Sequence, residues 1–300
     1  MMLNILAGIG IAFFGFVLQT SVAGFNRKVT GRIQKRYGPV WYQEFRDIFK
    51  LFTKRSVTHG WIFDFGIIMA LGGTIGTAMF IPLTTHTLAF AGYDNFFIYV
   101  YLIAVGMLGM AMSASGSGNP LASIGVMRAL TTMLAYEVPF MIVALTIINL
   151  TGTSSLTEIA LMQQGQFNWF AIALPLGGIV GFISLMGMLG KKPFETYVAP
   201  AEIASGPMVE YGGKQLGMLL VMHELSVFIE VSLFMYLFLG GAESIIMFLI
   251  KYVLIYTFAN MISSVNGRMK IDQVVLFFYK WPLIMAVTQA VIAIYLGWVI

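Results

Sequence analysis

The sequence predicts an all-α integral membrane protein, and two observations support this prediction. Hydrophobic residues make up 59% of the 300 residues and charged residues only 10%, well below the roughly 25% charged residues of a typical soluble domain. Apolar runs long enough to cross about 30 Å of hydrocarbon also recur along the whole sequence. We therefore treat residues 1–300 as a single membrane domain.

Eight apolar runs are expected to form transmembrane helices. They cover approximately residues 2–22, 62–83, 95–115, 125–150, 169–190, 216–240, 243–265 and 276–300. The first Lys or Arg is Arg27, after the first run has ended. Because a signal peptide carries its positive charge before a short apolar core, we expect the first run to be retained as a helix.

Basic residues predict the orientation. More than half of the seventeen Lys and Arg residues lie between Arg27 and Arg55, and most others lie in every second connection. The intervening connections, "TTHTLAFAGYDN", "TGTSSLTEIALMQQGQFN" and "GGAE", contain none. By the positive-inside rule, the loops at about 23–61, 116–124, 191–215 and 266–275 are cytoplasmic. Both termini are then outside the cell membrane.

The first cytoplasmic loop is expected to contain an amphipathic interfacial helix after the Gly38-Pro39 break. Apolar residues recur there at helical spacing, and charged residues occupy the other side. The apolar residues are Trp41, Phe45, Ile48, Phe49 and Phe52, and the charged ones include Arg46, Asp47, Lys50, Lys54 and Arg55. Such a helix either lies on lipid headgroups or presents its polar side to a docked partner, and the residues alone do not distinguish these.

Ionisable residues inside the predicted spans are functional candidates, because a charge in hydrocarbon costs several kcal/mol unless it is paired or hydrated. Glu137 and Glu224 are predicted at similar depths, about 12–13 Å from the cytoplasmic side at 1.5 Å per residue, with His223 beside Glu224. Pro139 disrupts a backbone hydrogen bond near Glu137. Two acids at one level repel unless one is protonated or hydrated, which favours a proton relay over a silent helix contact.

Glu230 and Lys251 on neighbouring spans form a second candidate pair. Their predicted depths are comparable in a 30 Å core, so the two side chains could form a buried ion pair. The alternative is a satisfied polar contact between helices without a transport role.

Redox chemistry within the chain is not expected. The sequence contains no Cys and three His residues, which excludes disulfides and Cys-held iron–sulfur, nickel or zinc centres and disfavours a multi-His metal site. We expect no metal or cofactor in this chain, so any redox centre belongs to another subunit. The basic residues flank apolar spans, which indicates membrane orientation and not nucleic-acid binding.

Four stretches occur in a recognisable order: "RIQKRYGP", then "LAYEVP" within the fourth expected span, then "KKPFETYVAPAEIASGPMVEYGGKQLG", then "NGRMKIDQ". Together they resemble the family of the H subunit of NADH-quinone oxidoreductase over nearly the whole chain. This family provides the membrane subunit of respiratory complex I on which the soluble redox arm sits. The resemblance implies eight spans and a linkage between a redox module and a buried ion path.

The resemblance assigns particular residues to the redox-module interface and the coupling loops. From the first loop they are Gln34, Arg36, Gly38 and Pro39; from the third loop, Pro193, Phe194, Glu195, Glu202, Glu210 and Tyr211; and from the last loop, Arg268, Asp272 and Gln273. Arg46 and Lys50, on the polar side of the predicted amphipathic helix, are added to these as the expected docking side if that helix holds a partner. It assigns Glu137 to the ion path, which we expect to include His223, Glu224, Glu230 and Lys251.

Departures from the family pattern refine the expectation. Quinone-reducing members usually carry Glu where this chain has Asn26, and further acids where it has Val198 and Pro200. The sixth-span acid is displaced, with His223 at the family position and Glu224 next to it. "SGPMVEYGG" and "SGNPLAS" resemble the counterpart subunit of membrane-bound, energy-converting nickel-iron hydrogenases and their ferredoxin-oxidising relatives.

The resemblance therefore implies a non-catalytic membrane anchor and coupling subunit of a complex I-like, ferredoxin-linked hydrogenase that moves H⁺ or Na⁺. The implied partners are hydrogenase-like large and small subunits, an iron–sulfur subunit and antiporter-like membrane subunits. Iron–sulfur clusters and a nickel-iron centre would lie in those partners. The alternatives are a quinone-binding member of the same family and a free-standing secondary transporter; a transporter is expected to show internal repeats, and we find none.

Overall fold

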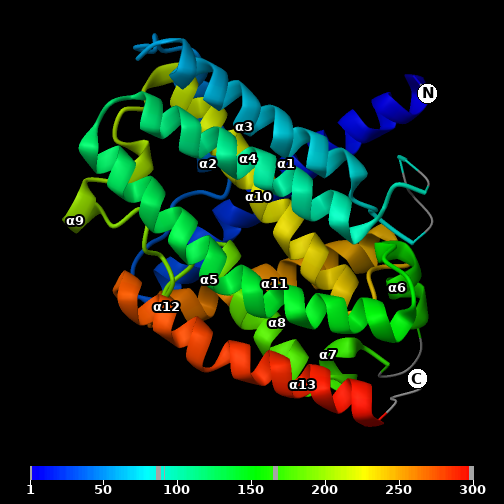
Figure 1. Ribbon diagram of the computed structural model, residues 1–300. Helices are drawn as coiled ribbons and strands as arrows, with labels where there is room; N and C mark the ends of the chain where they lie inside the picture. The colour runs from blue at the N-terminus through cyan, green and yellow to red at the C-terminus, as the bar shows by residue number, and fades with distance from the viewer. Residues whose placement is uncertain (1, 86–88, 91, 165–167, 297–300) are drawn as a thin grey trace.

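The computed structural model describes residues 2–85, 89–90, 92–164 and 168–296, and within these ranges the fold is helical, with an isolated bridge between Asn95 and Ser155. Seven helical stretches there are long and apolar enough to span a membrane. They are α1 (Met2–Ile33), α3 (Trp61–Phe80), α4 (Phe96–Gly116), α5 (Pro120–Thr151), α10 (Gly213–Phe238), α11 (Ile245–Val265) and the pair α12 (Ile271–Lys280) and α13 (Pro282–Leu296) (Figure 1).

The prediction of eight equivalent spans is not confirmed. The expected fifth span, 169–190, is divided into α7 (Phe170–Ala173) and α8 (Pro175–Met188), and α8 has only 14 residues. Helical geometry is interrupted at Leu174 (φ −117°, ψ 74°), because a residue that precedes proline disfavours the α conformation. Residues 297–300 of the expected last span, and parts of the first two outer connections, lie outside the described residues.

The remaining short helices lie in the connections. They are α2 (Gln43–Phe52), α6 (Leu156–Met162), α9 (Pro200–Ile203) and the 3₁₀ turn η1 (Gly206–Met208). A helix, α2, is therefore present in the first loop, where an amphipathic interfacial helix was predicted; its place at a membrane interface stays a prediction. The first span continues beyond its predicted end, since α1 reaches Ile33; α5 and α12 start earlier than predicted, at Pro120 and Ile271.

Local sequence explains where the spanning helices begin and end. The side chains of Asn95 and Asn119 accept hydrogen bonds from the backbone N–H groups of Phe97 and Leu121, as expected of N-cap residues. Pro120 follows its cap at a helical position where no N–H donor is needed. At the other end of α5, Gly152 adopts a left-handed conformation (φ 69°) that favours glycine and ends the helix.

Helix α10 forms the centre of the fold and positions the candidate site. It contacts α1, α2, α3, α6, α8 and α11, while α3 and α4 pack together on one side and α5, α12 and α13 lie on the other (Figure 1). Phe228 of α10 packs against Phe248 and Tyr252 of α11 at ring distances of 6.2 and 5.9 Å. Polar residues of α10 therefore face protein on nearly every side and not lipid.

Candidate functional site

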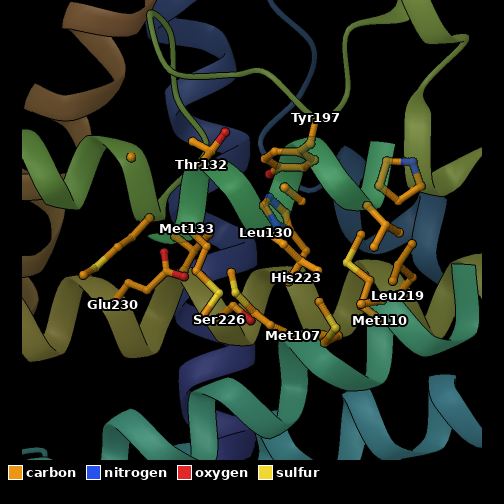
Figure 2. Close-up of a pocket in the computed structure, with 18 of the residues that line it drawn as sticks. Met107, Met110, Leu130, Thr132, Met133, Tyr197, Leu219, His223, Ser226 and Glu230 are labelled. Atoms are coloured by element: carbon orange, nitrogen blue, oxygen red, sulfur yellow. The ribbon is translucent and has the colours of Figure 1, made fainter. Parts of the chain in front are cut away.

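One face of α10 borders a methionine-rich cavity of about 90 Å³ between α4, α5 and α10. Figure 2 shows His223, Ser226 and Glu230 projecting from α10 toward Thr132 and Met133 of α5. Glu230 is 5% exposed, and its Oε2 atom has no hydrogen-bond partner. This face of α10 therefore combines apolar side chains with one buried carboxyl group. Because a buried, unpaired carboxylate is costly, this group needs either a bound proton or a water molecule.

Glu230 also borders a second cavity, of about 50 Å³, together with Glu137 of α5. The two acids share this cavity with Met133, Tyr136 and Phe140. The structure therefore brings Glu137 together with Glu230, whereas depth alone paired Glu137 with Glu224. Depth along the helix gave no information on the direction of each side chain around its axis, and so it did not predict this meeting.

Glu224 lies on the other side of α10. Residues 223 and 230 are two helical turns apart and share a face, while residue 224 is rotated by about 100° from residue 223. Glu224 is 6% exposed and borders neither cavity. It acts electrostatically on Glu44 of α2, and the Gln19 amide of α1 lies beside it. The predicted relay between Glu137 and Glu224 is thus replaced by two separate acid groups.

Lys251 does not pair with Glu230, which corrects the second predicted pair. Its Nζ donates hydrogen bonds of 2.7 Å to the carbonyl oxygens of Leu239 and Gly241 and lies 5.1 Å from the centre of the Trp169 ring. Those carbonyls follow the last turn of α10, where helical acceptors are left without intrahelical donors. The cation therefore caps the end of α10, as lysine does favourably at a helix C-terminus.

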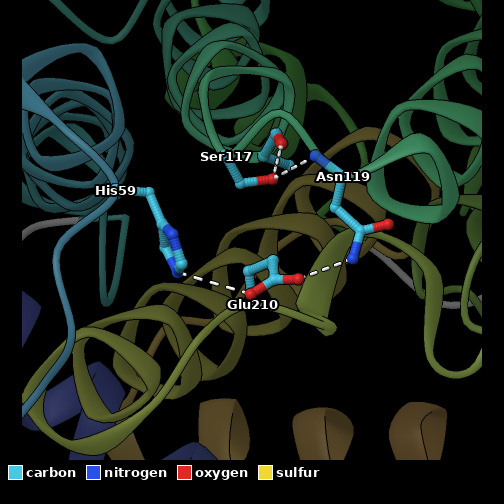
Figure 3. Close-up of polar contacts among 5 residues, drawn as sticks. His59, Ser117, Asn119 and Glu210 are labelled. Carbon is cyan, nitrogen blue, oxygen red and sulfur yellow. Dashed lines mark hydrogen bonds and ion pairs between the residues drawn. The ribbon is translucent and has the colours of Figure 1, made fainter.

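The third of the loops predicted to be cytoplasmic contains three acids, each paired with a base from another part of the chain. Arg268 donates to Glu195 at 2.9 Å, and Arg128 of α5 donates to Glu202 at 2.6 Å. His59 lies 3.4 Å from Glu210 (Figure 3). The hydrogen bond and charge of Arg128 lower the pKa of Glu202 from its ordinary value. The three acids of this loop that were predicted as coupling residues therefore all contact residues outside the loop.

Glu210 also accepts a hydrogen bond from Asn119 Nδ2 at 2.5 Å, so it joins the loop before α3, the loop before α5 and the third loop (Figure 3). Its neighbour Tyr211 is buried, with its ring 4.8 Å from that of Phe63. Burial raises the pKa of Tyr211 to about 12. The two residues of the predicted Glu-Tyr motif thus have different roles: Glu210 joins three loops, and Tyr211 packs in the core.

Tyr197 connects this loop to the membrane cavity, and the sequence analysis did not single it out. It borders the 90 Å³ cavity together with His223 and Glu230. Burial raises its pKa above the ordinary value, and the charges of Glu230 and Glu195 add to that effect. A chemical signal was present, since Tyr197 follows Glu195 by two residues, but only the fold shows that the loop turns into the cavity.

The last loop contributes an open polar cleft of about 240 Å³. Asp272, in the first turn of α12, lies in this cleft with Arg268 and Lys270 and with the Arg128–Glu202 pair. The cleft therefore brings the third and the last of the predicted cytoplasmic loops to one surface.

The first-loop residues surround α2. Arg36 donates to Gln34 at 2.7 Å, and Gly38 passes so close to α1 that a Cβ there would lie 2.6 Å from the Cα of Lys28. Pro39 follows directly, before the start of α2. Arg46 and Lys50 are exposed, as predicted. The apolar side is divided, since Ile48 is 3% exposed but Phe49 is 67% exposed.

Glu44 was not singled out by the sequence analysis. It is 8% exposed and forms an ion pair with Arg27 of α1. Burial and the charge of Glu224 raise its pKa to about 7, against the opposing charges of Arg27 and Lys191. An acid in the first turn of a helix normally reads as a solvated N-terminal charge, so nothing in the local sequence indicates its burial.

Comparisons with known proteins agree on one family. A family model described as NADH dehydrogenase matches residues 6–294. The H subunit of F(420)H(2) dehydrogenase from Methanosarcina mazei is 29% identical over 254 residues, covering 78% of this chain and 72% of that protein. Hydrogenase-4 component C of Escherichia coli is 29% identical over 264 residues, 82% of each chain. The H subunit of NADH-quinone oxidoreductase from Geobacillus sp. is 31% identical over 255 residues, 80% of this chain and 75% of that protein.

A solved structure is also similar over almost the full length. A chain in the structure of the membrane-bound sulfane sulfur reductase, an archaeal respiratory membrane complex, is 38% identical in sequence and superimposes with a TM-score of 0.91. The match covers 97% of this chain and 99% of that chain. The spanning helices and the connecting loops described above are therefore shared with a component of a respiratory complex.

Proposed function

Because the chain belongs to the NADH dehydrogenase family, we propose that it is the membrane anchor and coupling subunit of a complex I-like oxidoreductase that drives H⁺ or Na⁺ across the membrane. One observation supports this role above the others. The loop that carries Glu195, Glu202 and Glu210 contacts three cytoplasmic elements through these acids, and the same loop places Tyr197 in the cavity with Glu230. A partner that displaces the loop would therefore move Tyr197 relative to Glu230 in this cavity.

Electron transfer belongs to partner subunits in this proposal. Hydrogenase-like large and small subunits and an iron–sulfur subunit would dock on the cytoplasmic loops and carry iron–sulfur clusters, with ferredoxin as the electron donor. Antiporter-like subunits would adjoin the chain in the membrane. The similarity to a hydrogenase-4 component favours a nickel-iron centre in the large subunit.

A sulfur compound, instead of the protons that a hydrogenase reduces, is also favoured as the electron acceptor by a specific observation. The chain is 38% identical to a chain of a sulfane sulfur reductase, a higher identity than the 29% shared with the hydrogenase-4 component. A sulfur-reducing soluble arm would therefore fit the same anchor. The quinone alternative receives less support, because Asn26 replaces the acid that quinone-reducing members usually carry there.

The proposed topology has eight crossings of the cell membrane and both termini outside. The start of α1 and the end of α13 lie toward the same end of the bundle, near α6 and α7, while α9 lies at the opposite end (Figure 1). An even number of crossings is needed for that arrangement, and α7 with α8 would supply the eighth. The positive-inside rule then places α2 and α9 on the cytoplasmic side.

The test replaces Glu137 by Gln in the intact complex. Glu137→Gln preserves the size and hydrogen-bonding capacity of the side chain but cannot release a proton. We expect normal assembly and normal reduction of an artificial acceptor by the soluble arm, while ion pumping driven by the physiological reaction falls several-fold or more. Pumping is measured in proteoliposomes with a pH- or sodium-sensitive dye.

The matched control is Glu158→Gln, which neutralises an exposed acid of α6 on the opposite side of the membrane from the loops. It should pump as the wild type does. Wild-type pumping in an assembled Glu137→Gln complex would remove Glu137 from the ion path, and the coupling role would then have to be carried by Glu230 and the loop acids.

A further inference from the structure

Glu44 makes α2 part of a buried polar cluster. This helix lies across α1 and α10, and Glu44 is its only buried charged residue. One carboxyl oxygen pairs with Arg27, whose side chain is 48% exposed, while the other oxygen, Oε2, has no hydrogen-bond partner. The carboxyl group therefore lies between cytoplasmic solvent, reached along Arg27, and the interior of the helix bundle.

Glu224 of α10 is the acid that acts most strongly on Glu44. It is also buried, and its Oε2 atom likewise has no partner. The Gln19 amide lies beside the Glu224 carboxyl, although its Nε2 completes no hydrogen bond there. Tyr252 occupies the other end of that amide, since its hydroxyl donates to Gln19 Oε1 at 2.5 Å. Two buried acids thus each lack a donor in the same region.

The charged groups that face these acids come from every surrounding element. Arg27 belongs to α1, Asp47 to α2 and Lys191 to the start of the third loop. Burial lowers the pKa of Lys191, but Tyr256, Glu224 and Glu44 outweigh that effect and raise it. Lys191 donates to the Tyr256 hydroxyl at 3.3 Å. Lys191 therefore stays charged, and this charge, together with the guanidinium group of Arg27 on Glu44, disfavours a metal cation at this place.

We propose that Glu44 of α2 and Glu224 of α10 form a proton-binding acid pair at the joint between the two helices, loaded from the cytoplasmic side. A proton on either carboxyl group supplies the donor that the unpartnered oxygens lack and removes the repulsion between two neighbouring acids. The raised pKa of Glu44, about 7, agrees with proton uptake near neutral pH. The loaded proton reaches Glu44 beside the half-exposed Arg27.

This pair is distinct from the cavity acids. Glu137 and Glu230 share a cavity on one face of α10, whereas Glu224 lies on the face toward α1 and α2. The pair would give α2 an electrostatic influence on α10, because any partner that shifts α2 changes the separation of Glu44 from Arg27 and Glu224. By linkage, that shift changes the affinity for the proton, and proton binding changes the position of α2. This consequence rests on the proposed function, whereas the acid pair itself does not.

The test is a pH titration of the assembled complex without turnover, followed by infrared difference spectroscopy of the carboxyl C=O stretch. We expect the wild type to show a protonated-carboxyl signal that disappears near neutral pH. Glu44→Gln should lower that signal by the contribution of one carboxyl group, while the contribution of the buried cavity acid Glu230 stays. Glu224→Gln should keep the Glu44 contribution but lower its midpoint by about one pH unit or more, as expected when a strongly interacting acid is lost. Glu158→Gln, far from the pair, should leave the midpoint unchanged.

Three results would overturn the pair. They are an unchanged signal in Glu44→Gln, an unchanged midpoint in Glu224→Gln, and a wild-type midpoint that shifts with Na⁺ concentration, which would indicate a cation site. Should Glu44→Gln fail to assemble, Glu44→Asp keeps the carboxyl group, and an unshifted midpoint there would equally reject the proposal. Since no pumping is measured, a negative result here is separate from a negative result with Glu137→Gln.

Discussion

Replacing Gly24 by alanine should displace α2 from its seat on α1. Gly24 is buried in α1 at the point where the first loop crosses it. A methyl group there would lie 2.7 Å from the carbonyl carbon of Trp41 and 3.1 Å from its Cα, and closer still to the carbonyl oxygen. Because carbon contacts are ordinarily about 3.5–4.0 Å and the carbonyl oxygen lies closest of all, the loop must retreat by more than about 1 Å.

That retreat would be passed directly to α2, which begins two residues later at Gln43. Helix α2 stands to lose the ion pair of Glu44 with Arg27 and the close burial of Ile48. Overpacking of this kind typically costs about 1–3 kcal/mol. The strain falls on the contact between two elements and not on α1 itself, where alanine is a better helix former than glycine by about 1 kcal/mol.

The assay is retention of the soluble arm when the complex is purified in mild detergent, together with thermal unfolding of the membrane chain. Gly24→Ala should lose the arm several-fold and unfold at a lower temperature. The control is Gly10→Ala on the same helix, where a Cβ meets no atom within 4 Å, so that arm retention is unchanged and stability is equal or slightly higher. Wild-type arm retention in Gly24→Ala would show that the seat of α2 on α1 does not position the partner.

Two further predictions concern the outer face and the orientation. A cysteine at the exposed Glu158 should react with an impermeant thiol reagent added to intact cells, and one at Lys192 only after the membrane is opened; the reverse pattern would overturn the topology. Burial raises the pKa of Asp94, but hydrogen bonds from Ser155 and Thr157 outweigh it and hold that pKa below its ordinary value. Ionised Asp94 therefore adds stability that is present above about pH 4 and is lost as pH falls through its folded-state pKa. Stability should depend less on pH in this acid range in Asp94→Asn than in the wild type. Identical acid-unfolding profiles of the two proteins would count against this role.

The sequence by itself determined the class of the protein and the position of its main elements along the chain. Apolar run length predicted the seven spanning stretches because hydropathy is a property of each segment and depends little on its neighbours. The alternation of apolar and charged residues predicted α2 for the same reason. The loop acids Glu195, Glu202 and Glu210 were also identified in advance, through motifs that the family resemblance supplied.

Only the tertiary structure decided which polar groups meet. The interruption at Leu174 divides one expected span into two helices. Apolar run length did not predict this break, because a single residue carries little weight in an average over the whole run. Depth along a helix follows from counting residues, but the direction of a side chain around the axis changes by about 100° with each residue. A single step thus separates His223, which faces the cavity with Glu230, from Glu224, which faces α2.

Partner choice depends on the same directions and on the ends of neighbouring helices. Lys251 lies opposite free carbonyls at the end of α10 and caps them, although its depth suggested an acid as its partner. From the sequence, Glu44 looks like a solvent-exposed acid in the first turn of a helix. In the structure its carboxyl group is buried, because α2 packs across α1 and α10. Residue types and spacings set which groups are available, and helix packing sets which of them lose water together and therefore interact strongly.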